Sequence, residues 1–495
     1  MLKYILLALV PVLVWSCGAQ PTRHGDAGKV VLGMQLEPPG LDPTRGAAGA
    51  IDDVVYANIF EGLTRITEDG SVKPALAKSW TVSPDGREYT FTLQDGVHFH
   101  DGSTFDAADV KFTLDRARAA DSVNAQKALF TPIERVEVLD PLHVKVTLSH
   151  PVGDFLFNMG LGDAVMVDPK SAANNAVHPI GTGPFLFSEW RKGYAITLRR
   201  NDDYWGAPAK SKTIQFVFIT DPAAAFAALM GGDVHGFGGY PAPENLPAFE
   251  ADPRFDVVIG ATEGETILAI NNGRAPFNDI RVRRAIAHAL NRQEIIDGAM
   301  FGRGIPIGSH FSPGHRAYVD LTGMYPYDPV RARALLAKAG YPDGFAATLK
   351  LPPPSYARRS GEIIAAQLAK VGIRVSIENI EWAQWLEQVF TNKDYDLSIV
   401  AHTEPMDIGI YGRDDYYFQY HSDAFKGLMS KLAQTSDPAA RDRLYGEAQR
   451  LIAKDSVNGF LFQLVKMGVW DKRLKGMWAN APIQGADLHD VYLEN

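Results

Sequence analysis

Cysteine is nearly absent from this sequence, because Cys17 is the only one among 495 residues. A single thiol excludes an internal disulfide and any metal site built from paired cysteines. Blocks of basic residues are also missing, and the formal net charge is −9. Since contacts to a phosphate backbone require clustered Lys and Arg, we expect no nucleic-acid partner.

Motifs of common hydrolases and nucleotide-binding enzymes are missing too. The sequence has no Gly-x-Ser-x-Gly, no Walker lysine motif and no His-Glu-x-x-His helix. The Gly-Thr-Gly-Pro stretch at residues 181–184 leads into the strand-like "FLF", so no helix N-terminus is directed at a phosphate. We therefore expect no catalytic residues and no cofactor.

Long hydrophobic runs are limited to one, "YILLALVPVLVW", which follows Lys3. A dozen residues span roughly 18 Å as a helix, which is too short for a bilayer core of about 30 Å. The run is typical of an export signal, and Cys17 lies where that signal ends. Two alternatives stay open: acylation of Cys17 at a lipobox, which would anchor the protein to a membrane, or ordinary cleavage after Ala19.

The export signal predicts a location in the periplasm or on the outer face of the cell membrane. We assign residues 1–17 to the signal peptide with its lipobox, and residues 18–28, which are polar and contain glycine, to a tether. The whole sequence is 46% hydrophobic and 22% charged, which is typical of a globular protein of two or three domains.

The stretch "GVHFHDG" at residues 96–102 contains three residues of types that bind metals, His98, His100 and Asp101. It follows a predicted hairpin, "SWTVSPDGREYTFTL", in which Pro84-Asp85-Gly86 supplies the turn and apolar residues alternate in the second strand. Continuing that alternation places His98 and His100 on the polar face. Because a zinc site needs three or four convergent ligands, we interpret both histidines as part of the scaffold and expect no metal there.

Two later segments have the pattern strand, helix, strand. In "TIQFVFITDPAAAFAALMGGDV", Asp221 is the expected N-cap, followed by Pro222 at the first helical position. The segment "LKLPPPSYARRSGEIIAAQLAKVGIRVSIENI" repeats the pattern, with Gly372 ending the helix. Units of this kind predict an α/β protein with mixed sheets flanked by helices.

Residues 72–117, "VKPALAKSWTVSPDGREYTFTLQDGVHFHDGSTFDAADVKFTLDRA", resemble the signature of family 5 of the bacterial extracellular solute-binding proteins, the peptide/nickel/opine-type receptors of ABC importers. Further similarity follows in the family's order, in "GTGPF", "RRNDDYWG", "FNDIRVRRAIAHALNRQEI", "YDPVRARALLAKAGYPDG" and "IAAQLAKVGIRV". The resemblance implies a two-lobed periplasmic-binding-protein fold, type II-like with an extra inserted subdomain. It also implies a small-molecule solute and an ABC permease with its ATPase as partners.

By analogy with the family, lobe I comprises residues 29–60, 180–270 and 466–495, and residues 61–179 form the inserted subdomain. Lobe II comprises residues 271–465. Two crossings between the lobes, near "LAINNG" and near "QLVKMG", would form the hinge. We expect a monomer that closes around its solute.

Specificity is expected in the segment "IVAHTEPMDIGIYGRDDYYFQYHSDAF" that follows a predicted strand. The resemblance implies that an acidic residue here, Asp407 or Glu404, holds the α-ammonium group of a peptide. Other candidates for binding are His402, Arg413, the tyrosines Tyr411, Tyr416 and Tyr417, the tryptophans Trp382 and Trp385, Arg358 and Glu37. The tyrosines suit either the cleft walls or the core, and one tryptophan is expected in the core and the other in the cleft.

The leading hypothesis is capture of a short peptide or similar zwitterion without catalysis. A nickel-chelate receptor of the same family is the alternative, because His402 and Met406 lie in the specificity segment. An extracellular peptide or ester hydrolase is the alternative of another class, although the sequence supplies neither its nucleophile nor its metal.

Overall fold

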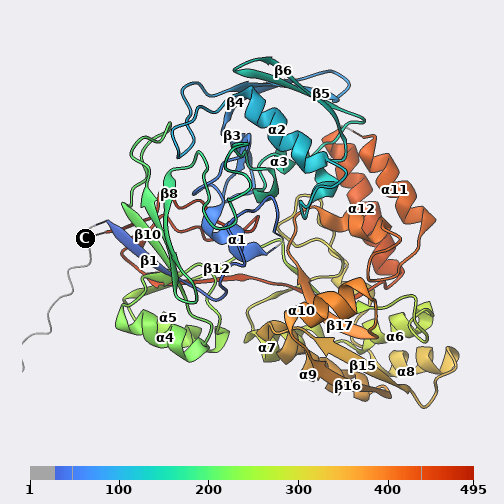
Figure 1. Cartoon of the computed structure of the whole chain (residues 1–495). Helices are drawn as coiled ribbons and strands as arrows, with labels where there is room; N and C mark the ends of the chain where they lie inside the picture. Colours follow the sequence, from blue (N-terminus) through green and yellow to red (C-terminus); the bar gives the residue numbers. More distant parts are fainter. Residues whose placement is uncertain (1–27, 47, 436, 495) are drawn as a thin grey trace, which may run out of the picture.

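The computed structural model describes residues 28–494 except residues 47 and 436. Within this range the chain forms two lobes and an inserted subdomain (Figure 1), each with its own sheet and its own buried apolar cluster. The export-signal prediction and Cys17 lie outside the described residues. Every helix in the described part of the chain is too short or too polar to cross a bilayer.

Lobe I contains a mixed sheet of seven strands. Its first strand, β1, pairs in parallel with β10 and β11, whereas the other pairings are antiparallel. In spatial order the strands are β12 (Phe255–Gly260), β19 (Lys466–Asp471), β11 (Gly236–Phe237), β1 (Lys29–Met34), β10 (Thr213–Phe218), β9 (Ala195–Arg200) and β8 (Phe185–Arg191). The last part of the chain thus returns to lobe I through β19.

The inserted subdomain is an antiparallel sheet covered by a helix. The strands lie in the order β4 (Ala77–Val82), β5 (Glu88–Leu93), β7 (His143–Leu148) and β6 (Ile133–Asp140). The predicted alternation in β5 is present, because Tyr89, Phe91 and Leu93 are buried against helix α2 (Ala107–Arg118) in one cluster. Asp106 caps α2 by accepting a hydrogen bond from the backbone N–H of Ala108.

Lobe II contains a sheet of six strands flanked by helices (Figure 1). The strand order is β14 (Ile305–Pro306), β18 (Gly459–Gln463), β13 (Glu265–Ile270), β17 (Leu397–His402), β15 (Phe345–Leu351) and β16 (Ile373–Asn379). The parallel pairing of β15 with β16 confirms the strand–helix–strand unit read from the sequence, with α9 (Ser355–Ala369) as its helix.

Several of the remaining helices begin at a residue whose side chain caps them. Asp221, Asn291 and Asp328 accept hydrogen bonds from backbone N–H groups at the starts of α4, α7 and α8. The bounds are α1 (Gly49–Val55), α3 (Phe155–Asn158), α4 (Pro222–Gly231), α5 (Leu246–Glu250), α6 (Ile280–Ala289), α7 (Arg292–Met300), α8 (Pro329–Lys338), α10 (Trp382–Trp385), α11 (Asp423–Ala433) and α12 (Pro438–Lys454).

The chain passes between the two large sheets at residues 261–264 and again at 464–465. The second crossing lies within "QLVKMG", as expected. The first lies earlier than "LAINNG", because β13 pairs with β17 and β18 and therefore belongs to lobe II. The boundary expected after residue 270 was placed too late.

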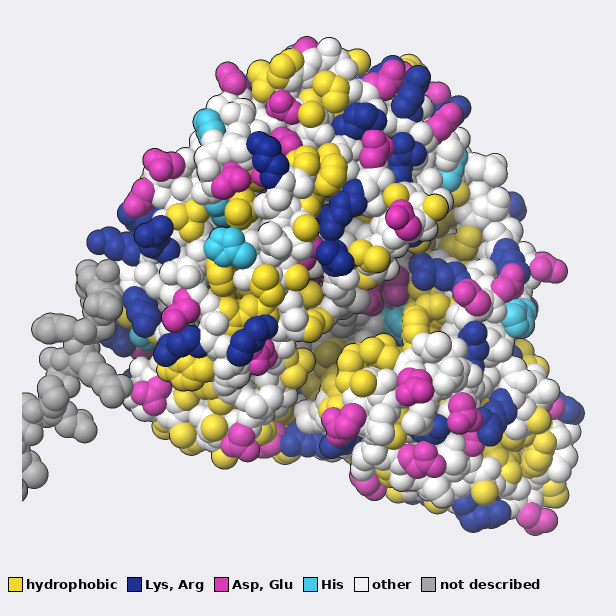
Figure 2. Space-filling model, in the orientation of Figure 1, with side chains coloured by type: hydrophobic (Ala, Val, Ile, Leu, Met, Phe, Trp, Pro, Cys, Tyr) yellow, Lys and Arg dark blue, Asp and Glu magenta, His cyan; other side chains and the backbone are white. Residues whose placement is uncertain are grey.

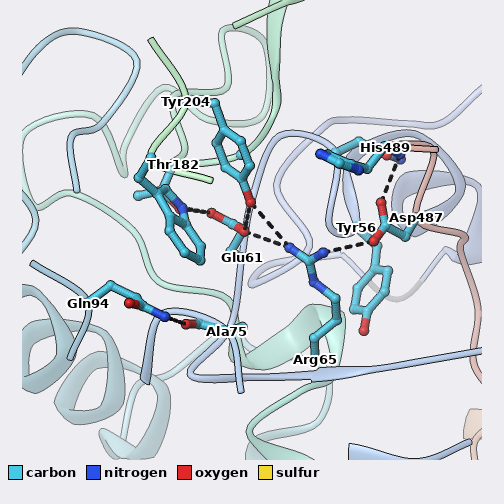
Figure 3. A network of polar contacts seen from close by, with 12 residues as sticks. Tyr56, Glu61, Arg65, Ala75, Gln94, Thr182, Tyr204, Asp487 and His489 are labelled. Carbon is cyan, nitrogen blue, oxygen red and sulfur yellow. Dashed lines mark hydrogen bonds and ion pairs between the residues drawn. The ribbon is translucent and has the colours of Figure 1, made fainter. Parts of the chain in front are cut away.

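Glu61 connects three segments that are distant in the sequence (Figure 3). Its buried carboxylate accepts hydrogen bonds from Thr182, Tyr204 and Trp205, and it pairs with Arg65 at 2.7 Å. Arg65 also pairs with Asp487 near the C-terminus at 2.9 Å. The "GTGPF" and "DDYWG" stretches therefore serve to join the inserted subdomain to lobe I.

The histidines of "GVHFHDG" have structural roles. Both ring nitrogens of His100 face the neighbouring loop: Nε2 lies 3.0 Å from the carbonyl oxygen of Gly183, and the backbone N–H of Gly181 donates to Nδ1 at 3.3 Å. Burial lowers the pKa of His100 to about 4, so its ring is neutral near pH 7. The scaffold interpretation holds, but His100 is packed against a loop and not on a wet face, whereas His98 is exposed.

Candidate functional site

Two adjoining cavities lie between the lobes. The larger has a volume of about 470 Å³ and the smaller about 230 Å³, and both are lined by Gly49, Thr403, Ile483 and Gln484. Figure 2 shows the hollow between the two halves of the molecule, with acidic and histidine side chains exposed inside it. The shared lining residues make the two cavities one continuous cleft.

The larger cavity is mainly apolar and is formed at the hinge. Residues 32–36 from lobe I, the crossing residues 262–264 and 464–466, and part of the C-terminal segment line it. Asp53, Glu263 and Lys466 are the charged side chains among its described lining residues. The Lys466 ammonium group donates to the carbonyl oxygens of Trp478 and Asn480, and burial lowers its pKa to about 8.

The smaller cavity is strongly acidic. Carboxylates from both sides line it, and Arg413 is the one basic side chain among its described lining residues. The acidic residues are Asp52, Asp154, Asp163, Glu404 and Asp407. Burial and, to a smaller extent, the nearby charge of Glu404 on the opposite lobe raise the pKa of Asp163 to about 7.

Three ion pairs join lobe II to the rest of the molecule. Arg441 pairs with Asp154 of the inserted subdomain at 2.5 Å, while Arg359 pairs with Glu244 at 2.8 Å and Arg303 with Glu250 at 2.5 Å in lobe I. Gln484 also donates a hydrogen bond to Thr403 across the cleft. These contacts define a closed arrangement of the lobes.

Asp407 lines the smaller cavity but its carboxylate is already engaged. His310 Nε2 lies 2.6 Å from one oxygen, and His402 Nδ1 lies 3.5 Å from the other. Burial alone would raise the pKa of Asp407, but these two imidazoles hold it below its usual range. Met406 precedes it with a φ of 65°, a left-handed conformation that turns the segment at this point.

The aromatic candidates belong mainly to the core of lobe II. Tyr411 and Tyr417 are each 1% exposed, whereas Tyr416 is partly buried beside them. Trp385 is buried and donates to the Ser398 hydroxyl, and the exposed Trp382 stacks on it at 5.2 Å without lining either cavity. Trp385 is therefore the tryptophan that was expected in the core. Trp382 is not the tryptophan expected in the cleft, because it lies outside both cavities.

Four other candidates have separate surroundings. Glu37 accepts hydrogen bonds from the Trp190 indole and the Gly193 backbone and lines neither cavity. Arg358 lies 3.8 Å from Glu381 and is likewise outside both. Arg413 and Glu404 do line the smaller cavity, as expected for residues that contact a solute.

Sequence reasoning missed most of the charged lining of the cleft. Asp52, Asp163, Glu263 and Lys466 come from four separate segments, and no local pattern marks them. It also missed His310 and the buried Glu265, which lie beside Asp407. The one available signal was the position of Glu263 and Glu265 next to a crossing between the lobes.

This arrangement, two α/β lobes closing on a cleft at their hinge, defines a two-lobed binding protein. The sequence profile of the bacterial extracellular solute-binding proteins, family 5 (middle region), matches residues 71–423. The chain belongs to this family, whose members are the extracellular solute receptors of ABC importers.

Relatives of known identity cover nearly the whole chain. A glutathione-binding protein, GsiB, of Salmonella paratyphi A is 31% identical, with 92% of each chain covered. Di/tripeptide-binding protein 1 of Pseudomonas aeruginosa is 28% identical, with 96% of this chain and 97% of the relative covered. The periplasmic binding protein DppA from Helicobacter pylori, solved with the peptide STSA, has a TM-score of 0.86 at 28% identity, covering 95% and 98%.

Proposed function

We propose that this protein captures a short peptide, or a solute with the same zwitterionic ends, and delivers it unchanged to an ABC permease. The observation that carries the proposal is the continuous cleft between the lobes, apolar at one end and acidic at the other. The named relatives favour a peptide-like solute over a nickel chelate and over the substrate of a hydrolase.

The larger cavity suits a peptide backbone. Two of its lining residues, Gly238 and Gly239, are consecutive glycines, and because they carry no side chain a solute can approach the main chain closely there. Main-chain hydrogen bonds hold an extended peptide whatever its side chains are. Lys466 is the cation that we assign to the carboxylate end of the solute, since charge-assisted bonds orient a ligand strongly.

We assign the α-ammonium group to the smaller cavity, between Asp52 and Asp163 on one side and Glu404 on the other. Without a cation, closure brings these like charges together, so a positive group between them stabilises the closed form. Asp407, favoured from the sequence, is the weaker choice because His310 and His402 already engage its carboxylate.

Calorimetry with trialanine and its blocked derivatives tests the proposal. We expect trialanine to bind, and N-acetylation, which removes the ammonium charge, to weaken binding at least tenfold, or about 1.4 kcal/mol. Lys466→Met should weaken binding of free trialanine but leave the C-amidated peptide unaffected. Failure of free peptides of two to five residues to bind, together with no peptide released on denaturing the native protein, would refute it.

Three finer points complete the proposal. The solute leaves the protein chemically intact, so chromatography of a peptide incubated with the protein should show a single unchanged species. Cys17 carries a lipid that holds the protein at the outer face of the membrane, which mass spectrometry of the detergent-extracted protein would detect. The receptor is a monomer, so sedimentation should give the mass of a single chain.

A further inference from the structure

A cluster of four potential metal ligands lies in lobe II, behind the wall of the smaller cavity. Glu265 begins β13, His310 follows β14, His402 ends β17, and Asp407 begins the 3-10 helix η6 (Asp407–Gly412). Donor atoms of Glu265, His310 and Asp407 all lie within 4.8 Å of one another, and those of His402, Glu404 and Asp407 form a second such group, which shares Asp407 with the first. Glu265 is 3% exposed and His310 is fully buried, so the donors converge away from bulk solvent.

The two imidazoles are oriented in the same way. Nδ1 of His310 lies 3.2 Å from the Tyr411 hydroxyl, and Nε2 of His402 lies 2.9 Å from the Tyr417 hydroxyl. In each ring the second nitrogen faces Asp407. Metal-bound histidines are held in this manner, with one nitrogen on the ion and the other on a fixed hydrogen-bond partner.

Charge balance supplies an independent observation. The Glu265 Oε2 atom is buried and has no hydrogen-bond partner among the described residues. A buried carboxylate is costly unless it is protonated or bound to a cation. A divalent ion would neutralise Glu265 and Asp407 together.

We propose that Glu265, His310, His402 and Asp407 bind one divalent transition-metal ion, a site held entirely by the protein and separate from any metal that a solute could carry. Two imidazole nitrogens and two carboxylate oxygens form a ligand set that suits Zn²⁺ and its first-row neighbours. Asp407 also lines the smaller cavity, which gives the ion a path from solvent.

The ion would add a bond between four segments, of which β13 and β17 already pair as neighbouring strands, with Glu265 opposite His402. These are the start of β13 next to the hinge, the segment after β14, the end of β17, and η6 in the cavity wall. The site therefore fixes the position of residues 402–412 whether or not a solute is present. This inference does not rest on the peptide proposal, and either can fail alone.

Zinc titration of the full chain, prepared without a polyhistidine tag and freed of metal with EDTA, tests the site. We expect one equivalent of bound Zn²⁺ by elemental analysis and a higher unfolding temperature on zinc addition. Co²⁺ in place of Zn²⁺ should give visible absorption bands. Glu265→Gln and His402→Gln should abolish stoichiometric binding, and Tyr411→Phe should lower zinc affinity about 10- to 100-fold, as loss of an orienting partner does.

His288→Gln is the matched control. His288 is also buried in lobe II, but its Nδ1 faces the carbonyl oxygen of Pro326 and it lies outside the cluster, so the variant should bind zinc like the unchanged protein. Folded protein that takes up no stoichiometric zinc would overturn the inference. Equal zinc affinity in Tyr411→Phe and the unchanged protein would also overturn it, and this test stands even if Glu265→Gln fails to fold.

Discussion

Arg441 of α12 donates a hydrogen bond to Asp154 of the inserted subdomain, with the two side-chain atoms 2.5 Å apart. The Arg441 side chain is only 9% exposed, and Tyr445 donates to the same carboxylate oxygen at 3.0 Å. This pair joins lobe II to the opposite side of the cleft at the far end from the hinge, beside the smaller cavity. Its contribution exists only when the lobes are closed.

Arg441→Met should therefore weaken solute binding. A hydrogen bond to a charged group contributes about 2 kcal/mol, or roughly a thirtyfold change in Kd, and calorimetry measures it directly. Arg316→Met is the control, because Arg316 pairs with Asp442 inside lobe II at a comparable distance of 2.8 Å. Equal affinities for the Arg441 variant and the unchanged protein would show that this pair does not stabilise the closed form.

Affinity for a cationic solute should rise from pH 5 to pH 7. Burial raises the pKa values of Asp163 and Glu263 to about 7 each, with the charge of Glu404 as a smaller cause at Asp163. As these groups ionise, the cleft becomes more negative while an α-ammonium group keeps its charge. Asp163→Asn should flatten this pH dependence of the affinity. Asp203→Asn, at an exposed position, should leave the pH dependence unchanged. A flat profile in the unchanged protein would contradict the assignment.

The solute-free protein should show the opposite trend in stability. Carboxyls whose pKa is raised on folding hold more protons in the folded state than in the unfolded state between about pH 4 and pH 7. Their contribution is therefore largest below pH 4 and is lost as the pH rises through 7. Relative to the unchanged protein, the unfolding temperature of Asp163→Asn should become increasingly higher as the pH approaches 7. A constant difference across this range would count against the raised pKa.

Glu61→Gln should destabilise lobe I and the inserted subdomain together. The substitution leaves Arg65 without its closest partner and removes a buried carboxylate that accepts three other hydrogen bonds. Breaking such a pair costs about 3 kcal/mol of unfolding free energy, measurable by urea unfolding. Glu134→Gln removes an exposed pair with Arg87 and should change stability by less than about 0.5 kcal/mol. Similar losses in both variants would contradict the role of the network.

His100→Leu should lower the unfolding free energy by about 2 kcal/mol, because it leaves the N–H of Gly181 unpaired and removes one of the hydrogen-bond partners of the Gly183 carbonyl, which keeps Asn201. His98→Leu is a close control two residues away, since His98 is exposed and bonds only to Gly96 among the described contacts. Metal content should be the same in both variants. A metal loss specific to His100→Leu would reopen the metal interpretation of this stretch.

The sequence predicts much of the fold because the signals that carry it are local. Asp221 caps the helix that its position indicates, and β4 and β5 form the hairpin expected around residues 84–86. The first lobe crossing was misplaced because β13 is buried along its whole length. A strand without alternation does not indicate which sheet it joins.

Less of the cleft than of the fold could be predicted from the sequence, because the charged lining of the cleft comes from segments that are distant along the chain. Glu404, Asp407 and Arg413 of the expected specificity segment line the smaller cavity, and their contact with a solute stays a prediction. The role of Asp407 depends on His310, almost a hundred positions away along the chain, and no spacing rule links the two. The exposure of His100 was misjudged for the same reason, because the loop at residues 181–183 covers it.

Small-angle X-ray scattering of the protein with and without the solute recovered from it tests the central claim most directly. Closure of two lobes on a solute predicts a smaller radius of gyration in the bound form, matching the closed structure, and a larger one after the solute is removed. Identical scattering curves at saturating solute would contradict the account.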